Sequence, residues 1–456
     1  MTSTLSRDSV DGLRQQFSGE VVGPDDVGYD EMRAVHNGLI DKRPALIARC
    51  INTADIADAV RFGRTEGLEI STRGGGHGVA GKAVTDGGMM VDLANMRGSY
   101  VDPTRRRARV QGGATWNDYN RATHQHGLAT TGGVVSTTGV AGLTLGGGIG
   151  WLMGQFGMAV DNLTSVELVT ADGDVLQVNA DTDPELFWGL RGGGGNFGIA
   201  ASLEFDAHPI DTIFGGIVAY PLSETLPVFA AYQDVAADAP DEFTNFFGLV
   251  HAPDGSGHKI VALPVCHTGD ISTGEALVAP LRTVGTPAVD MIGPMPYPVV
   301  NTILDGAYPK GARNYWKSAF FKELSEEVIG LLVDAFERVP SAMTGIVIEQ
   351  FHGATTRIDP TATAYPHREP GYNMVLTGEW LDPAEDEENI AWVRSTFDAL
   401  RPHTADAVYV NYVAADEPER IRTAYGPNWE RLVALKRTWD PDNVFHLNQN
   451  IDPSSG

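Results

Sequence analysis

Residues 70–81 read Ile70-Ser71-Thr72-Arg73-Gly74-Gly75-Gly76-His77-Gly78-Val79-Ala80-Gly81, and a short strand-like lead, Leu68-Glu69-Ile70, runs into them. Glycine allows positive φ and lets a ligand approach the backbone closely, because no Cβ is in the way. Successive N–H groups in such a loop form a cradle for an anion such as a pyrophosphate, and Arg73 adds a charged donor at its edge. The alternative interpretation is a surface turn whose histidine, His77, faces water, since glycine-loop patterns often match by chance.

The composition is that of a globular protein with an acidic balance. The chain has 456 residues, of which 42% are hydrophobic and 20% are charged. This length exceeds what one hydrophobic core usually serves, so we expect two domains. The formal net charge of −26 repels phosphate backbones and anionic lipid surfaces, which argues against a nucleic-acid or membrane-surface partner.

Signals for export, membrane insertion and disulfide formation are weak in this sequence. The residues from Met1 to Asp8 lack the apolar stretch of a signal peptide, and no run approaches about 18 consecutive apolar residues. The two cysteines, Cys50 and Cys266, are too few for a disulfide framework or a cysteine-rich metal site. We therefore expect a cytoplasmic enzyme without a membrane span or a metal centre, with Cys50 buried as a small apolar residue.

Short strands and helices surround the glycine loop. Asn52 or Thr53 is a suitable N-cap for a helix over residues 55–67, whose apolar positions share one side. Runs at residues 89–93 and 107–110 are bounded by turn residues and are typical of short strands.

A later glycine stretch, residues 192–198, can be compared with the fingerprint of a doubly wound dinucleotide-binding fold. Gly193, Gly195 and Gly198 match the spacing G-x-G-x-x-G, but that fingerprint should open a helix after a strand. Residues 199–205 follow it and read as a strand instead. Upstream, the Asp-Gly pair at residues 172–173 between two β-rich runs predicts a hairpin. The glycine-rich turns therefore connect strands in a β-rich region, which indicates an α+β fold.

The middle of the chain has a different character. Past about residue 209, strand-like runs such as 216–220 and 246–250 alternate with acidic helices around 223–236 and 384–400. The acidic residues near the start of the last helix are expected to form a solvated face. A sheet with helices on one face suits a separate domain that covers a substrate.

These features together resemble the FAD-linked oxidases of the vanillyl-alcohol-oxidase superfamily, specifically the berberine-bridge-enzyme-like branch and its singly linked bacterial members. The resemblance covers nearly the whole chain. Its most specific motifs are Arg73 to His77, Gly146 to Gly150, Asp161-Asn162, Tyr409-Val410-Asn411-Tyr412 and Asp440 to Asn450.

The resemblance implies an α+β fold with a two-part PCMH-type FAD-binding domain. Residues 1–207 would form its N-terminal part, and residues 408–456 would return to complete it. Residues 208–407 would form a substrate domain, an antiparallel sheet covered by helices.

The resemblance also assigns the cofactor contacts of the glycine loop. His77 matches the residue bonded covalently to the 8α-methyl group of FAD, and a neutral imidazole is a nucleophile near physiological pH. Backbone N–H groups of Gly74, Gly75, Gly76 and Gly78 would hold the pyrophosphate. The alternative for His77 is a hydrogen bond to the cofactor without a covalent link. Ile199 matches a position whose backbone touches the cofactor, or is an ordinary strand residue.

The chain departs from the family pattern at one position. Many members attach FAD a second time, through a cysteine. Alignment on Gly139 and Gly142, which lie in the second glycine stretch, places Val135 where that cysteine would stand. We therefore expect a single covalent link through His77, and a bulky oligosaccharide substrate becomes a weaker expectation.

Thr138 matches the position that lies over the reactive edge of the flavin. In the family, valine there accompanies reactivity with O₂ and leucine its suppression. Threonine is no bulkier than valine, so it should admit O₂, although a β-branched residue in a strand is also ordinary.

Two residues are candidates for the catalytic base. Tyr412 matches the base of several family members, but a tyrosine pKa near 10 must be lowered for that work. Glu349 aligns with an acidic base of some alkaloid oxidases, and a carboxylate in so apolar a strand is costly to bury without a partner or a task. If Ile348 faces the core, Glu349 could instead be solvated. Gln350 and His352 are weaker candidates for the pocket.

Three further residues match family positions near the cofactor: Tyr409 and Asn411 beside the flavin ring and ribityl chain, and Asn448 from the tail. Packed aromatic rings and satisfied amides in a segment that closes a domain would explain them equally well.

The sequence thus predicts an FAD-dependent oxidase. It would pass a hydride from a small or mid-sized alcohol, amine or phenol-like metabolite to flavin N5 and reduce O₂ to H₂O₂. One rival is a dehydrogenase of the same fold with another electron acceptor. A second is a non-catalytic flavin-binding protein, against which Tyr412 and the intact His77 loop argue. No sequence feature indicates an oligomeric state.

Overall fold

A small, partly parallel sheet carries the glycine loop. The computed structural model describes residues 5–455. The sheet has the order β1-β2-β4-β3, and β4 pairs in parallel with both β2 and β3. These strands are Glu20–Val22 (β1), Leu46–Arg49 (β2), Met89–Asp92 (β4) and Ile70–Arg73 (β3). Helix α3 (Thr53–Thr65) connects β2 to β3, and its N-cap is Asn52, whose side chain accepts the N–H of Asp55.

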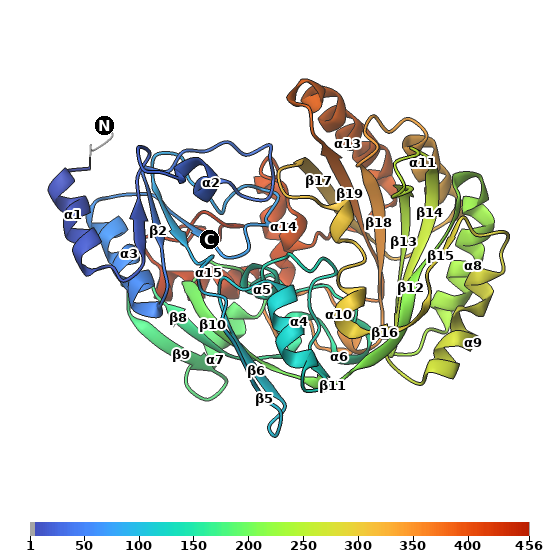
Figure 1. Cartoon of the computed structure of the whole chain (residues 1–456), viewed down its shortest axis with the longest axis horizontal. Helices are drawn as coiled ribbons and strands as arrows, with labels where there is room; N and C mark the ends of the chain where they lie inside the picture. The colour runs from blue at the N-terminus through green and yellow to red at the C-terminus, as the bar shows by residue number, and fades with distance from the viewer. Residues whose placement is uncertain (1–4, 456) are drawn as a thin grey trace.

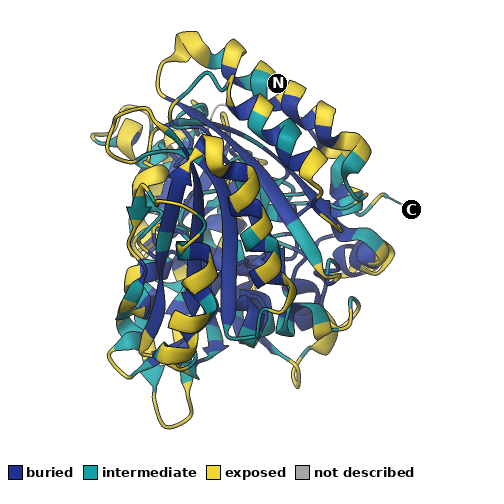
Figure 2. Cartoon of the chain, turned by 90° about the vertical axis from the view of Figure 1, so that its right-hand side faces the viewer, coloured by how far each residue is buried: buried dark blue, intermediate teal, exposed yellow. Residues whose placement is uncertain are grey.

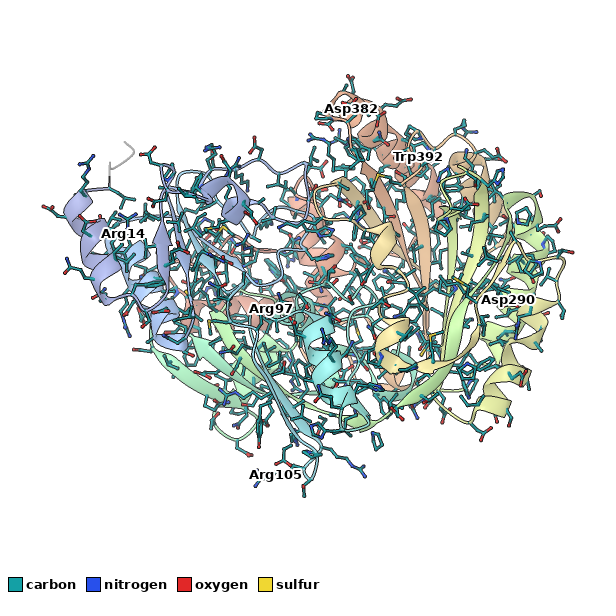
Figure 3. The ribbon with its side chains drawn as sticks, in the orientation of Figure 1. Arg14, Arg97, Arg105, Asp290, Asp382 and Trp392 are labelled. Atoms are coloured by element: carbon teal, nitrogen blue, oxygen red, sulfur yellow. The ribbon has the colours of Figure 1, made fainter. Side chains whose placement is uncertain are left out.

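A five-stranded antiparallel sheet lies below the first in Figure 1. Its order is β5-β6-β10-β8-β9, formed by Ser99–Asp102, Arg107–Gln111, Ile199–Asp206, Leu163–Val169 and Val175–Asn179. The β8–β9 hairpin is confirmed, with Gly173 at a φ of 77° in its turn. Strand β10 starts one residue after Gly198, so the glycine stretch opens a strand and not a helix. Arg105, between β5 and β6, projects from the tip of that hairpin (Figure 3).

The right-hand part of the molecule is an eight-stranded antiparallel sheet, ordered β15-β12-β14-β13-β18-β19-β17 with β16 also paired to β12. These strands are Val289–Asp290 (β15), Thr212–Pro221 (β12), Lys259–His267 (β14), Phe243–His251 (β13), Gly345–Phe351 (β18), Gly371–Trp380 (β19), Arg313–Phe321 (β17) and Gly293–Pro296 (β16). The predicted α+β fold, with an antiparallel sheet covered by helices, is confirmed.

Four helices cover one face of this sheet: α8 (Thr225–Ala237), α9 (Ile271–Arg282), α11 (Glu326–Phe336) and α13 (Asp386–Leu400). Figure 2 shows their exposed outer sides over buried strands. Phe229, Leu332 and Val393 from the helices share one core with Ile348 and Leu376 from the strands. Alternation along each strand therefore directs the neighbouring side chains to the opposite face, toward the glycine loops.

One expectation about α13 needs correction. Glu387 and Glu388 are exposed, as a solvated face requires, but Asp386 is not free. Its carboxylate pairs with Arg313 at 2.5 Å and accepts from the indole of Trp380 at 2.7 Å. The first turn of α13 is therefore fixed to the sheet.

Among residues 5–455, none of the helices has the length and the apolar character that a membrane span requires.

The last part of the chain packs on the N-terminal part. Helices α14 (Ile421–Tyr425) and α15 (Trp429–Trp439) contribute to the core that contains Phe197 and Leu203. The buried ammonium of Lys436 bonds to Asp440 at 2.6 Å and donates to the carbonyl of Asn196. The Asn196 side chain in turn accepts the N–H of Ile451 at 2.9 Å. The glycine stretch of residues 192–198, which contains Asn196, is thus tied to the C-terminal segment.

Candidate functional site

A single cavity between the glycine loops and the eight-stranded sheet collects the predicted site residues. Its lining includes Gly74, Gly75, Gly76, His77, Gly78, Val135, Thr138, Gly139, Gly142, Ile199, Glu349, Tyr409, Asn411, Tyr412 and Asn448. Three residues expected at the site from sequence, Arg73 and the weaker candidates Gln350 and His352, do not line this cavity.

Arg73 is a correction to the expected cradle. It lies in β3, not in the loop, and its guanidinium makes a bidentate pair with buried Asp92 at 2.6 and 2.8 Å. A further N–H of Arg73 donates to the carbonyl of Ala34. Its donors are therefore used inside the protein, and Arg73 fixes the strand from which the loop departs.

The first two glycine loops touch backbone to backbone. A Cβ added to Gly75 would lie 2.4 Å from both the Cα and the N of Gly139. Gly76 has a φ of 71°, which side chains other than glycine rarely adopt. Within residues 5–455, the N–H groups of residues 75–80 have no hydrogen-bond acceptor. A row of free N–H groups at a cavity wall can bind an anion.

The open positions along the cavity suit a long cofactor such as FAD. A Cβ added to Gly78 or Gly142 would meet no atom within 4 Å. The Oδ1 atom of Asn448 is buried and lacks a partner in the described chain, while its Nδ2 donates to the carbonyl of Phe445. Free N–H groups at one point and an unpartnered amide oxygen at another fit a ligand that carries both anionic and donor groups.

His77 is held by two neighbours. Its Nε2 lies 2.9 Å from the hydroxyl of Thr137, and its ring stacks on that of His36 with centroids 3.7 Å apart. Burial and the nearby His36 lower the pKa of His77 to about 3. The imidazole is therefore neutral at physiological pH and keeps a nucleophilic nitrogen.

Val135 also lines the cavity, and its isopropyl side chain offers no nucleophile there. The next residue, Ser136, is bound through its N–H and its hydroxyl to the carboxylate of Asp305, at 2.8 and 2.6 Å. This contact fixes the loop that carries Val135 and Thr138 against the segment that leads into β17.

Across the cavity from the glycine loops, Glu349 of β18 is hydrogen-bonded to Tyr412 of the C-terminal segment. The Tyr412 hydroxyl donates to Glu349 Oε1 at 3.0 Å, and the amide of Asn373 donates to Glu349 Oε2 at 2.6 Å. Glu349 is 2% exposed although Ile348 faces the helix-covered core. The solvated alternative for Glu349 is therefore wrong, because Tyr412 and Asn373 cover its carboxylate on the opposite face of this strand.

Burial raises the pKa of both Glu349 and Tyr412, but only Glu349 then titrates near neutral pH. Burial raises the pKa of Glu349 to about 7, even though the hydrogen bonds from Asn373 and Tyr412 lower it. Burial and the adjacent charge of Glu349 raise the pKa of Tyr412 well above its usual 10. A tyrosine base requires neighbours that lower its pKa, and the structure has the opposite. Glu349 is thus the group that can accept a proton near neutral pH, and Tyr412 donates a hydrogen bond to it.

The weaker candidates beside Glu349 lie away from the cavity. Gln350 donates to the carbonyl of Ala236 on the helix-covered side, and His352 contacts the carbonyl of Pro240. Neither lines the cavity.

Tyr409 and Asn411 form a support beneath the second glycine stretch. The buried Tyr409 hydroxyl accepts from the N–H of Gly148 and from the Asn411 amide, both at 2.8 Å. Asn411 also donates to the carbonyl of Leu143. The Tyr409 ring meets that of Tyr412 edge to face, with centroids 4.8 Å apart, and so sets the position of the Tyr412 hydroxyl.

Several residues at or near the cavity are marked by no sequence motif. Tyr308, Trp316, Val375 and Thr377 line the substrate side of the cavity. The alternation along β17 and β19 could have indicated Trp316 and Thr377 once those strands were placed. His36 and Tyr308 lie in loops, and no sequence signal marks them.

Besides Glu349, a second buried carboxyl, that of Glu379, lies in β19 on the same face as Thr377. Glu379 follows Thr377 by two residues, is fully buried, and neither of its carboxyl oxygens has a hydrogen-bond partner within residues 5–455. Burial raises the pKa of Glu379 to about 8. It is therefore held as a neutral acid at pH 7.

In the described part of the chain, no three His, Cys, Asp or Glu side chains lie close enough together to hold a metal ion.

Two family models match the chain. One, described as an FAD binding domain, matches residues 44–179, and the other, described as berberine and berberine like, matches residues 408–452. The (R)-6-hydroxynicotine oxidase of Paenarthrobacter nicotinovorans is 32% identical over 452 residues, 96% of this chain and 97% of the relative. The uncharacterized FAD-linked oxidoreductase YgaK of Bacillus subtilis is 29% identical over 447 residues, 96% of this chain and 98% of that relative.

Solved structures give the same picture. The crystal structure of 6-hydroxy-D-nicotine oxidase from Arthrobacter nicotinovorans superposes with a TM-score of 0.89 at 29% identity, covering 99% of this chain and 100% of that one. Phl p 4, a grass pollen allergen described as having glucose dehydrogenase activity, shares the fold. Its TM-score is 0.85 at 21% identity, covering 97% of this chain and 99% of the allergen.

Proposed function

Because the chain belongs to the berberine-bridge-enzyme-like family of FAD-linked oxidoreductases, we propose that it is an oxidase with FAD attached through His77 alone. The substrate would be a small or mid-sized organic alcohol, amine or phenol-like metabolite, and O₂ the electron acceptor. Bound FAD would accept the hydride. The protein would orient the substrate along the eight-stranded sheet and take up the substrate's proton.

The hydrogen-bonded pair of Glu349 and Tyr412 carries this proposal. It faces the glycine loops across one cavity, and its carboxylate has a pKa of about 7. A base that titrates near the working pH transfers protons efficiently. A protein that only stores flavin has no need of a buried carboxylate, which costs stability. The pair therefore favours an enzyme over a flavin carrier.

The substrate class can be tested by anaerobic mixing. Each compound of a panel is added to the purified protein, and loss of the flavin absorbance reports hydride transfer. The panel would hold an alcohol, an amine and a phenol of one or two rings, together with 6-hydroxynicotine, which the relative's name gives as its substrate. Bleaching by at least one member is expected. No bleaching by any member, in protein that dithionite reduces normally, would contradict an oxidase of this substrate class.

The covalent link can be tested by acid precipitation. In wild-type protein we expect the yellow colour to stay in the pellet and the intact mass to rise by one FAD. His77→Ala should release the colour to the supernatant, because no other side chain within residues 74–81 is a nucleophile. His126→Ala, at an exposed site, is the matched control and should keep the link. Colour in the wild-type supernatant would exclude covalent attachment.

The acceptor can be tested at Thr138. We expect Thr138→Leu to slow reoxidation of the dithionite-reduced protein by O₂ about 10-fold or more, because a longer side chain fills the wall where O₂ must reach the flavin. Thr377→Leu makes the same change on the opposite wall and should leave the rate nearly unchanged. Stopped-flow absorbance measures both without a substrate.

A dehydrogenase of the same fold is the second candidate, since Phl p 4 is described as having that activity. It predicts slow reoxidation in air already in the wild type, and rapid reoxidation by an artificial acceptor such as a quinone.

A further inference from the structure

The only aromatic ring stacked on His77 among the described residues is that of His36. The two imidazoles lie at 25° to one another with centroids 3.7 Å apart, which is contact distance. On its edge, His77 presents Nε2 to the Thr137 hydroxyl at 2.9 Å. One neighbour thus determines the plane of the ring and the other occupies one of its two nitrogens.

His36 is itself firmly placed. Its ring is buried, its backbone N–H donates to the carbonyl of Gly76, and its carbonyl accepts the N–H of Gly311. The next residue, Asn37, exchanges hydrogen bonds with the backbone of Asn314 at the start of β17, both at 2.8 Å. His36 is therefore held from the glycine loop on one side and from the eight-stranded sheet on the other.

We propose that His36 and Thr137 are positioning residues for covalent attachment of FAD to His77. His36 fixes the ring plane, and Thr137 accepts the Nε2 hydrogen, which leaves Nδ1 with the free lone pair as the bonding nitrogen. This inference rests on the histidyl link of the proposed function. It adds two residues that neither the sequence motifs nor the family resemblance had indicated.

The attachment balances with O₂ as the oxidant. A C–N bond replaces one C–H bond of the 8α-methyl group and the N–H bond of the imidazole, and O₂ takes up the two hydrogens as H₂O₂. The step requires a neutral His77, since a protonated ring has no lone pair to donate. A second neutral ring in contact supports this state. Burial and the nearby Lys310 lower the pKa of His36 to about 4, so it carries no charge at pH 7.

The variants separate stacking from mere packing. His36→Ala removes the ring, His36→Phe keeps a flat ring, and Thr137→Val removes the acceptor. The matched control is His208→Ala. His208 is also partly buried and stacked, on Phe156 with centroids 3.8 Å apart, but it does not line the cavity. Each variant of the full chain is produced with limited riboflavin and then supplied with FAD and O₂.

Two quantities are measured in each variant: total bound FAD, and the fraction that stays with the acid-precipitated protein over time. We expect His36→Ala and Thr137→Val to slow attachment about 10-fold or more, with total FAD binding retained. His36→Phe should recover most of the rate, and His208→Ala should match the wild type. The peptide from digested wild-type protein should carry the flavin on Nδ1.

The outcomes that overturn the inference are distinct. Attachment at the wild-type rate in His36→Ala, or an equal loss of total FAD binding and attachment, would reduce His36 to a structural role. Failure of His36→Phe to recover the rate would exclude stacking as the cause. A wild type whose FAD is entirely non-covalent would instead disprove the histidyl link itself, and with it the proposed mode of attachment.

Discussion

Glu349→Gln is expected to lower the rate of hydride transfer from substrate by about 10²- to 10⁴-fold, the usual cost of losing a general base. Glutamine has nearly the same size, and its amide oxygen can accept the hydrogen bond of Asn373 while its NH₂ group donates to the Tyr412 hydroxyl. It cannot take up a proton. Folding and FAD content should therefore be retained, so that the loss reports on chemistry.

The pH dependence makes this test sharper. The pKa of Glu349 is about 7, so the wild-type rate at low substrate should rise with pH through about 7 as the carboxylate ionises. Glu349→Gln should lose this rise. Glu388→Gln, the same change at an exposed site on α13, is the control and should keep it. If the Glu349→Gln variant retained the rise, Glu349 would be excluded as the base.

Tyr412→Phe distinguishes the two candidates further. The Tyr412 hydrogen bond lowers the pKa of Glu349, so its removal should move the rise in rate to higher pH without abolishing it. If Tyr412 were the base, the phenylalanine variant would lose the rise instead. Anaerobic stopped-flow bleaching of the flavin across pH 5–10 gives both profiles.

Glu379→Gln should stabilise the protein, and increasingly so as the pH rises. Burial raises the pKa of Glu379 from 4.5 to about 8, so the folded state holds the proton more tightly than the unfolded chain. The stability that the neutral acid contributes is complete below about pH 4.5 and is lost as the pH rises through 8. By linkage the difference between wild type and glutamine variant reaches up to about 5 kcal/mol above pH 8.

Chemical denaturation at pH 5, 7 and 9 measures this effect. The midpoints of Glu379→Gln and wild type should nearly coincide at pH 5 and separate progressively at pH 7 and 9. Glu388→Gln should follow the wild type throughout. A constant difference between Glu379→Gln and wild type at all three pH values would show that Glu379 ionises freely in the folded state.

The sequence identified the parts of the site that depend on local backbone chemistry. Glycines that must touch another backbone, such as Gly75 against Gly139, leave a visible pattern. Arg73 was misassigned because its partner, Asp92, comes from a parallel strand 19 residues later. A charge near a glycine loop looks available until the sheet register is known.

The electrostatics of the base could not be predicted for a similar reason. Whether Tyr412 or Glu349 holds the proton depends on a contact between residues 63 positions apart and on the burial of both. Likewise, the stacking of His36 on His77 depends on a loop held by β17. These properties arise only when segments far apart in sequence pack together, and no short segment encodes them.

One wall of the cavity is formed by the C-terminal segment, which is synthesised last. Lys82, beside the glycine loop, donates to the carbonyl of Asn448 at 2.5 Å, although the two are 366 residues apart in sequence. At about 5 to 20 residues per second, a ribosome needs roughly 20 to 70 s to cover that interval. The glycine loop thus leaves the ribosome long before its opposite wall exists. We therefore expect the finished polypeptide to capture FAD, and a nascent chain stalled before residue 448 to carry no flavin.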